Sequence, residues 1–274
     1  MNRELILSPH ARQGIGYWLD LWHARELLMF LAWRDIMVRY KQATLGVLWA
    51  VLRPIMTTIV FTLVFGKIAK LPAGEIPYPL LVLSGMAIWF YFASTVGECG
   101  NSLVANSSLI TKVYFPRLVV PISAVLANLI DFAITSALLA VMLVYYGVAV
   151  QWSLMLVPLV MLTLVLLSVG IGLWISALNA KYRDVQFILP FILMFGLYLS
   201  PVGYASSVVP ETWRWLFNLN PMVGIIDGFR WMLFGATYDF HWWSLAYTFC
   251  LSILLVVSGI AFFRSVEREL VDIL

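Results

Sequence analysis

Long apolar runs separated by short polar segments dominate the pattern of the chain. Each run has close to the ~20 consecutive apolar residues that a helix needs to cross the hydrocarbon core of a bilayer. The pattern therefore predicts an all-α integral membrane protein with six transmembrane helices. Their predicted ranges are 46–66, 78–97, 119–146, 153–178, 185–202 and 244–263.

Before the first span, residues 23–42 alternate apolar and charged positions at roughly helical spacing, with too many charges to cross a membrane. This pattern predicts an amphipathic helix in the interface plane. This helix is expected either to anchor the chain at the membrane surface or to have a mechanical role. Residues 1–22 are mixed and are expected to lie along the surface or to fray. The chain thus divides into an N-terminal segment, 1–45, and a six-span transmembrane domain, 46–274.

Residues 101–121 form a polar break between the second and third spans. Asn106, Ser107 and Ser108 are residue types that cap helix N-termini. Pro116 forbids further helix and favours an extended Phe115. We expect a short rigid helix over 109–114 that acts as a lever, on a surface that another protein can push.

Residues 203–243 form the longest segment on the opposite side. The apolar block 222–234 within it, about 13 residues long, is too short to span the bilayer. With Pro210, Trp213, Trp215 and the pair Asn220-Pro221, it predicts short re-entrant or interfacial helices that cap the outer face.

Composition and charge agree with this topology. The chain is 62% hydrophobic and 11% charged, which excludes a soluble domain of this size. Lysine and arginine gather in residues 1–45, in the loops around 112–117 and 181–183, and in the C-terminal tail. Because positive charge collects on the cytoplasmic side, both termini are expected to be cytoplasmic.

Candidate catalytic chemistry is sparse. The sequence has no HExxH motif, no Cys/His cluster and no GxxxxGK[ST] loop, so we expect no catalytic residue, metal or cofactor on this chain. Asp131 lies well inside a span and Glu98 at a span end. Asp131 either bonds to a neighbouring helix or carries a proton, and the scarcity of intramembrane acids favours the bond.

Aromatic residues make up 15% of the chain, and several fall inside the predicted spans. They either line a path for a sugar chain or serve ordinary packing and lipid contact. Arg53, just before Pro54 in the first span, is expected to reach the near interface or to face a partner helix, and Pro54 to kink this span. The candidate path residues are Arg53, Phe61, Phe65, Trp89, Phe92, Phe195 and Tyr198.

Several motifs occur in a recognisable order: LW…LRP at 48–54, LSG…WF at 83–90, LITKVYFPR at 109–117, YRDV at 182–185 and NPM at 220–222. Together they resemble the membrane subunit of type-2 ABC transporters that export polysaccharides, most closely the O-antigen and wall teichoic acid exporters. LITKVYFPR and YRDV are the specific blocks.

This resemblance implies a homodimer of permease subunits with two copies of a separate ATPase, which would bind ATP and Mg. The segment 109–117 would be the coupling helix, residues 23–42 the interface helix and residues 203–240 the gate helices. The implied ATPase-coupling residues are Leu109, Ile110, Lys112, Tyr114, Phe115, Arg117, Arg183 and Asp184. The implied gate residues are Trp213, Trp215, Asn220 and Pro221.

The expected function is ATP-driven export of a lipid-linked, O-antigen-type polysaccharide across the bacterial inner membrane, with no nucleic-acid partner. Exporters of capsule, teichoic acid, drugs or lipids are alternatives in the same class. A membrane enzyme acting on lipid-linked sugars and a structural scaffold are alternatives from other classes.

Overall fold

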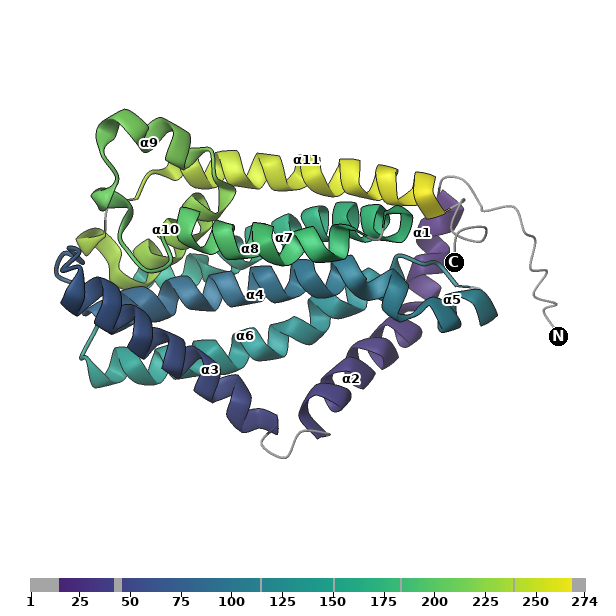
Figure 1. The fold of residues 1–274 in the computed structure, drawn as a ribbon, viewed down its shortest axis with the longest axis horizontal. Helices are drawn as coiled ribbons and strands as arrows, with labels where there is room; N and C mark the ends of the chain where they lie inside the picture. Colours follow the sequence, from purple (N-terminus) through teal and green to yellow (C-terminus); the bar gives the residue numbers. More distant parts are fainter. Residues whose placement is uncertain are drawn as a thin grey trace.

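The computed structural model describes residues 15–41, 46–113, 115–149, 151–182, 184–238 and 240–267, and its regular elements in these ranges are all helices. Long helices run side by side, with α1 and α5 at one end and α9 and α10 at the other (Figure 1). The long helices of the bundle are α4 (Tyr78–Ala105), α6 (Val119–Tyr145), α7 (Val157–Lys181) and α11 (Trp242–Glu267).

Helix α4 is the centre of the bundle, and most of its residues are buried between its neighbours. Close helix packing elsewhere depends on small residues, as is common in membranes. A Cβ atom at Gly170 in α7 would lie 2.8 Å from the Leu255 backbone carbon of α11, and one at Gly259 would lie 2.9 Å from the Gly170 oxygen. Glycines at both positions therefore let α7 and α11 approach backbone to backbone.

Five helices in the described residues are long and apolar enough to cross a membrane. The predicted fifth span at 185–202 is observed as α8 (Val185–Leu199), whose 15 residues extend about 22 Å, short of the ~30 Å hydrocarbon core. The predicted second span 78–97 continues to Ala105, so Glu98 lies inside a helix instead of at a span end.

The first span changes helix type along its length. Helix α3 (Gly46–Phe61) continues through Pro54 and is followed by a π-helix, η1 (Thr62–Ile68). The predicted first span at 46–66 is confirmed as a continuous helical segment of membrane-spanning length. The seven residues of the π-helix are too few for their wider turn to appear in the apolar pattern, so the sequence did not reveal it.

Part of the predicted mixed stretch, residues 1–22, is helical, and its residues 1–14 lie outside the described residues. The expected surface helix is α2 (Arg25–Lys41), and a second helix, α1 (Ile15–His23), precedes it. Distant contacts hold α1: the Tyr17 hydroxyl lies 3.3 Å from a Glu267 carboxylate oxygen, and Arg264 stacks on the Tyr17 ring. These partners are about 250 residues away in sequence and invisible to local patterns.

The predicted lever is helix α5 (Ser107–Lys112), which begins two residues earlier than expected. Asn106 does not cap it through its side chain, because its amide nitrogen donates to the Ser102 oxygen at 2.9 Å and its amide oxygen accepts from Arg34 at 2.9 Å.

At the other end of the bundle, the predicted helix pair is α9 (Glu211–Asn218) and α10 (Pro221–Phe234). Short 3₁₀ turns complete the fold: η2 (Trp152–Leu156), η3 (Ser206–Val208) and η4 (Gly235–Thr237).

Candidate functional site

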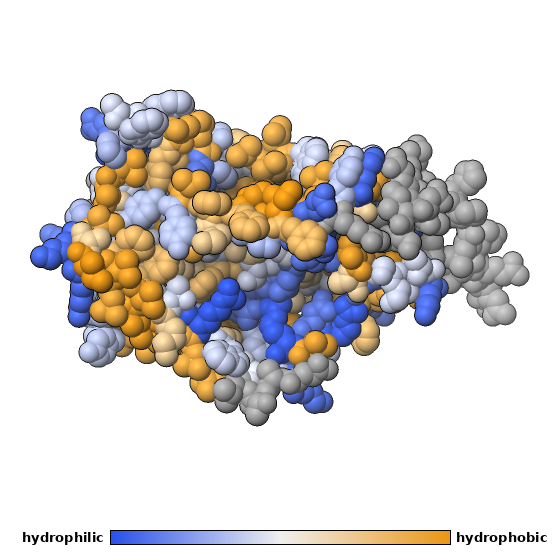
Figure 2. All heavy atoms as spheres, viewed as in Figure 1, coloured by the Kyte–Doolittle hydropathy of each residue, from blue (hydrophilic) through white to orange (hydrophobic). Residues whose placement is uncertain are grey.

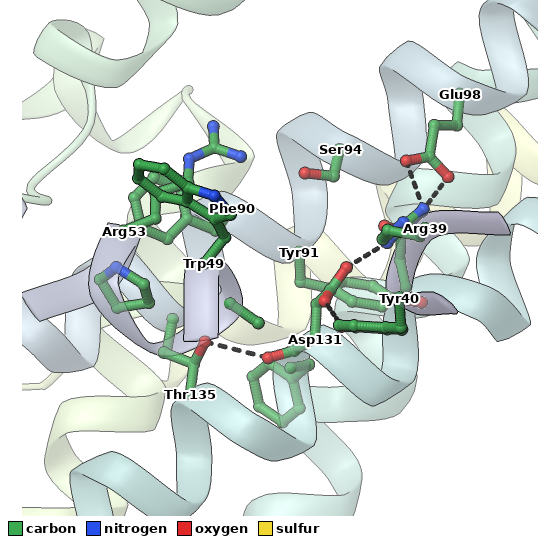
Figure 3. Close-up of a pocket in the computed structure, with 15 residues that line it drawn as sticks. Arg39, Tyr40, Trp49, Arg53, Phe90, Tyr91, Ser94, Glu98, Asp131 and Thr135 are labelled. Atoms are coloured by element: carbon green, nitrogen blue, oxygen red, sulfur yellow. Dashed lines mark hydrogen bonds and ion pairs between the residues drawn. The ribbon is translucent and has the colours of Figure 1, made fainter. Parts of the chain in front are cut away.

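A polar pocket of about 240 Å³ lies between α2, α3, α4 and α6 (Figure 3). It gathers charged groups from parts of the chain that are far apart in sequence. The charged residues that line it are Arg39, Arg53, Glu98 and Asp131.

Arg39 of α2 is the centre of this pocket. Its guanidinium donates to Glu98 of α4 at 2.6 Å and forms a second ion pair with Asp131 of α6, which also accepts from the Tyr40 hydroxyl. Asn128 donates to the other Glu98 oxygen at 2.9 Å. Burial lowers the pKa of Arg39, but the two carboxylates outweigh it and raise the pKa, so this group stays charged. The expected bond from Asp131 to a neighbouring helix is confirmed.

Arg53 of α3 lies on the other wall of the same pocket. Its guanidinium carbon is 4.8 Å from the centre of the Phe90 ring of α4, an attractive cation–π arrangement. This confirms that Arg53 faces another helix. Among the described residues no carboxylate forms an ion pair with Arg53, whereas Arg39 has two. Arg53 is therefore the cation of this pocket that remains available to an anion.

A second charged network lies at the opposite end of the bundle and was missed from the sequence. Arg230 of α10 is fully buried, and its guanidinium donates to the backbone oxygens of Leu81 at 2.8 Å and Val202 at 3.0 Å. It also donates to the Tyr204 oxygen at 3.0 Å. These bonds tie α10 to α4 and to the segment after α8. Arg230 is thus a buried structural residue.

Asp227 completes this network. It accepts from the Ser206 hydroxyl at 2.6 Å and from the Tyr238 hydroxyl at 2.6 Å, and Tyr238 in turn accepts from Arg230 at 3.2 Å. Burial raises the pKa of the Asp227 carboxyl above its ordinary value, although the nearby Arg230 charge opposes the shift. The spacing of an acid and a base three residues apart within an apolar helix was the sequence signal for this pair.

The candidate path residues do not form one site. Phe61 and Phe65 pack together with ring centres 5.2 Å apart, whereas Arg53 lies in the polar pocket. Trp89 and Phe92 are buried, with ring centres 5.5 Å apart. Phe195 and Tyr198 are exposed on α8.

Part of the predicted path and part of the predicted gate line one apolar groove of about 820 Å³ between α4, α7, α8 and α9. We call it the α8 groove. Asn220 caps α10 by accepting from the Met222 N–H at 3.0 Å, and Trp215 is exposed outside the lining. The predicted residues that line the groove are Trp89, Phe92, Phe195, Trp213, Asn220 and Pro221.

The predicted coupling residues divide into buried and exposed groups. Ile110 and Phe115 are each 8% exposed and pack in a cluster with Leu31 and Phe263, so they face the protein interior. Lys112 is exposed, and Leu109 is half-buried. The Arg117 N–H donates to a Glu267 carboxylate oxygen at 3.2 Å.

Three further coupling predictions are Tyr114, which follows α5, and Arg183 and Asp184, which lie in the loop before α8. Asp184 is exposed and precedes the first residue of α8. Tyr114 and Arg183 lie outside the described residues. The residues of α5 that the fold leaves exposed are Ser108, Thr111 and Lys112.

Comparisons with known proteins identify relatives over the whole length. A family model described as "ABC-2 type transporter" matches residues 26–234. The chain is 28% identical to the O-antigen export system permease protein RfbA of Klebsiella pneumoniae, over 98% of this chain and 100% of that protein. It is 31% identical to the protein of the same name from Myxococcus xanthus, over 77% and 81% of the two chains. The polysialic acid transport protein KpsM of Escherichia coli is 25% identical, over 86% and 92%.

Proposed function

This chain belongs to the ABC-2 type transporter family, and we propose that it is the transmembrane subunit of an exporter for a lipid-linked polysaccharide of O-antigen type. The observation that carries the proposal is the end-to-end similarity to O-antigen export permeases. Five apolar helices of membrane-spanning length support a multi-pass protein of the inner membrane, a transporter subunit rather than an enzyme. Export of a capsular polysaccharide is the second candidate, favoured by the more distant similarity to KpsM.

The working assembly in this proposal is a homodimer with two copies of a separate ATPase, which binds ATP and Mg. Met56, Val60, Phe187 and Met194 are exposed on α3 and α8, so both helices have apolar surface that a second copy could cover. Helix α8 and the residues that follow it would supply the sixth crossing. Both termini and α5 would face the cytoplasm, where positive charge gathers.

ATP-driven movement would enter through the exposed side of α5. The inner side of this segment supports such a role, because Ile110 and Phe115 pack against residues of α2 and α11. Arg117 joins the same segment to Glu267 at the end of α11. A push on α5 would therefore be passed to several helices together and would tilt the first and fifth spans. The headgroup of the lipid carrier, a pyrophosphate, would be attracted by Arg53 as the substrate enters from the cytoplasmic leaflet.

The test is an affinity purification of the protein from native membranes in mild detergent, with mass spectrometry of the proteins and lipids. We expect a stoichiometric P-loop ATPase together with a polyprenyl-linked glycan. A capsular glycan would favour the second candidate, and the absence of an ATPase would contradict the proposal.

The docking surface has its own test. Lys112→Glu reverses an exposed charge on α5, so we expect about tenfold weaker ATPase binding, equivalent to ~1.4 kcal/mol. Lys70→Glu at the other end of the bundle is the matched control and should leave binding unchanged. Equal affinity of both variants, measured with purified ATPase, would move the docking surface away from α5.

A further inference from the structure

The polar pocket and the α8 groove lie on either side of one face of α4. Phe90 and Tyr91 line the pocket, and their neighbours Trp89 and Phe92 line the groove. Figure 2 shows the result on the surface: hydrophilic residues gather near α2 and α3, with hydrophobic residues beside them toward α8. A polar hollow with an available cation thus adjoins a large apolar one.

The two hollows also differ in depth along the bundle. Arg53 lies seven residues from the start of α3, or about 10 Å along its axis. The groove follows α8 from Leu189 to Leu199. This stretch begins about 6 Å from the start of α8 and is about 15 Å long. Arg53 stacks on Phe90 of α4, whereas the groove reaches Trp213 and Asn220 at the α9 end of the bundle, so the groove extends further toward that end than Arg53 does.

The chemistry of the α8 groove argues against a sugar chain as its occupant. Its lining is almost entirely aliphatic and aromatic, and its polar side chains are Ser200 and Asn220. Asn220 already donates to the Leu199 oxygen at 3.2 Å and to the Ser200 hydroxyl at 3.0 Å. A glycan placed here would lose its hydrogen bonds to water without replacement, which is costly. A hydrocarbon chain has no such cost, and a hollow of this size is typical of ligand sites.

We infer that the α8 groove binds the hydrocarbon tail of the lipid carrier while its anionic headgroup lies at Arg53. This rests on the proposed function and assigns a place to the lipid part of the substrate. The arrangement matches an amphiphile of the cytoplasmic leaflet, whose head lies at the inner side and whose tail points toward the membrane centre. Trp89, Phe92 and Phe195 then contact isoprenoid carbons and not sugar rings.

The test uses the full chain with its ATPase in proteoliposomes and, as a probe, a polyprenyl diphosphate that carries a diazirine in its hydrocarbon. After illumination, we expect mass spectrometry to find the label on peptides of α8 and α9. Ile192→Trp, which fills the groove at a position 56% exposed, should reduce this label about tenfold. Leu254→Trp on α11, at a position 63% exposed outside the groove, is the matched control and should not.

A second variant tests the headgroup contact separately from the tail contact. Arg53→Gln should weaken probe binding several-fold and abolish the preference for the diphosphate over the uncharged polyprenol, while the remaining label stays on α8 and α9. Thermal unfolding of each purified variant checks that the fold is retained.

Two results would overturn the inference. One is labelling spread equally over α6, α8 and α11, as a photoreactive phosphatidylcholine would give. The other is an Ile192→Trp protein labelled as strongly as the Leu254→Trp control, which would also follow if a second copy covered the groove. Export of glycan by the same proteoliposomes, measured in parallel, would show that the proposed function stands even where the tail site fails.

Discussion

Two arginines, one near each end of the bundle, organise the charged chemistry of this protein in opposite ways. Arg230 is 0% exposed, and its hydrogen bonds go to backbone oxygens and hydroxyl groups. Arg39 is partly exposed in a pocket, and it bonds two carboxylates from two other helices. The first arrangement fixes α10 within the bundle. The second holds a surface helix by charges that solvent or a ligand can reach.

The comparison teaches that the bonding partners decide what a membrane-embedded cation does. Backbone oxygens cannot change their charge or leave, so the Arg230 network is a permanent part of the fold. Carboxylates on separate helices can exchange one cation for another, so the Arg39 network permits α2 to separate from α4 and α6. We therefore place rigidity at the end of the bundle that carries α9 and α10 and adaptability where α2 packs on α4 and α6.

The largest effect is expected for Arg230→Ala. Truncation leaves several buried backbone oxygens and the Asp227 network without their donor, at a cost of about 3–5 kcal/mol. Unfolding of the purified protein in detergent measures this loss. Arg214→Ala, an exposed arginine on the neighbouring α9, should change stability by less than about 0.5 kcal/mol. Similar values for the two variants would contradict the rigid role of Arg230.

A smaller effect is expected for Arg39→Ala. It leaves Glu98 and Asp131 unpaired, but their partial exposure limits the cost to about 1–2 kcal/mol. The triple variant with Glu98→Gln and Asp131→Asn should recover part of this stability, because the uncompensated carboxylates are then neutral. If the triple variant unfolds as easily as Arg39→Ala, the carboxylates are not what Arg39 balances.

The smallest effects on stability are expected when a tyrosine hydroxyl is removed, and each network contains one such hydroxyl. Tyr238→Phe removes a buried donor to Asp227, and we expect a loss of about 1–2 kcal/mol. Tyr40→Phe removes a donor to the more exposed Asp131, so we expect less than about 1 kcal/mol. The unfolding midpoint of each variant measures the loss, and we expect the lower midpoint for Tyr238→Phe. A lower midpoint for Tyr40→Phe would contradict the comparison.

Local patterns predicted the features that depend on neighbours in sequence. Span-length apolar runs gave the long helices, and charged alternation gave α2 between residues 25 and 41. Pro116 and the polar break gave a short helix before α6. The apolar block 222–234 gave α10, which runs from Pro221 to Phe234. The family motifs lie in these same segments, so they led to the transporter class as well.

Contacts between distant residues escaped these patterns. Arg230 bonds Leu81 across 149 positions, and its local spacing from Asp227 does not show that it is buried. The partner of Asp131 is likewise 92 positions away. The packing of the helices also separates the Phe61–Phe65 pair from the aromatics that line the α8 groove. The sequence by itself determined which segments enter the membrane, because that depends on the apolar content of each segment. Only the tertiary structure decided which charges are buried, paired or available, because burial and pairing are properties of the assembled helices.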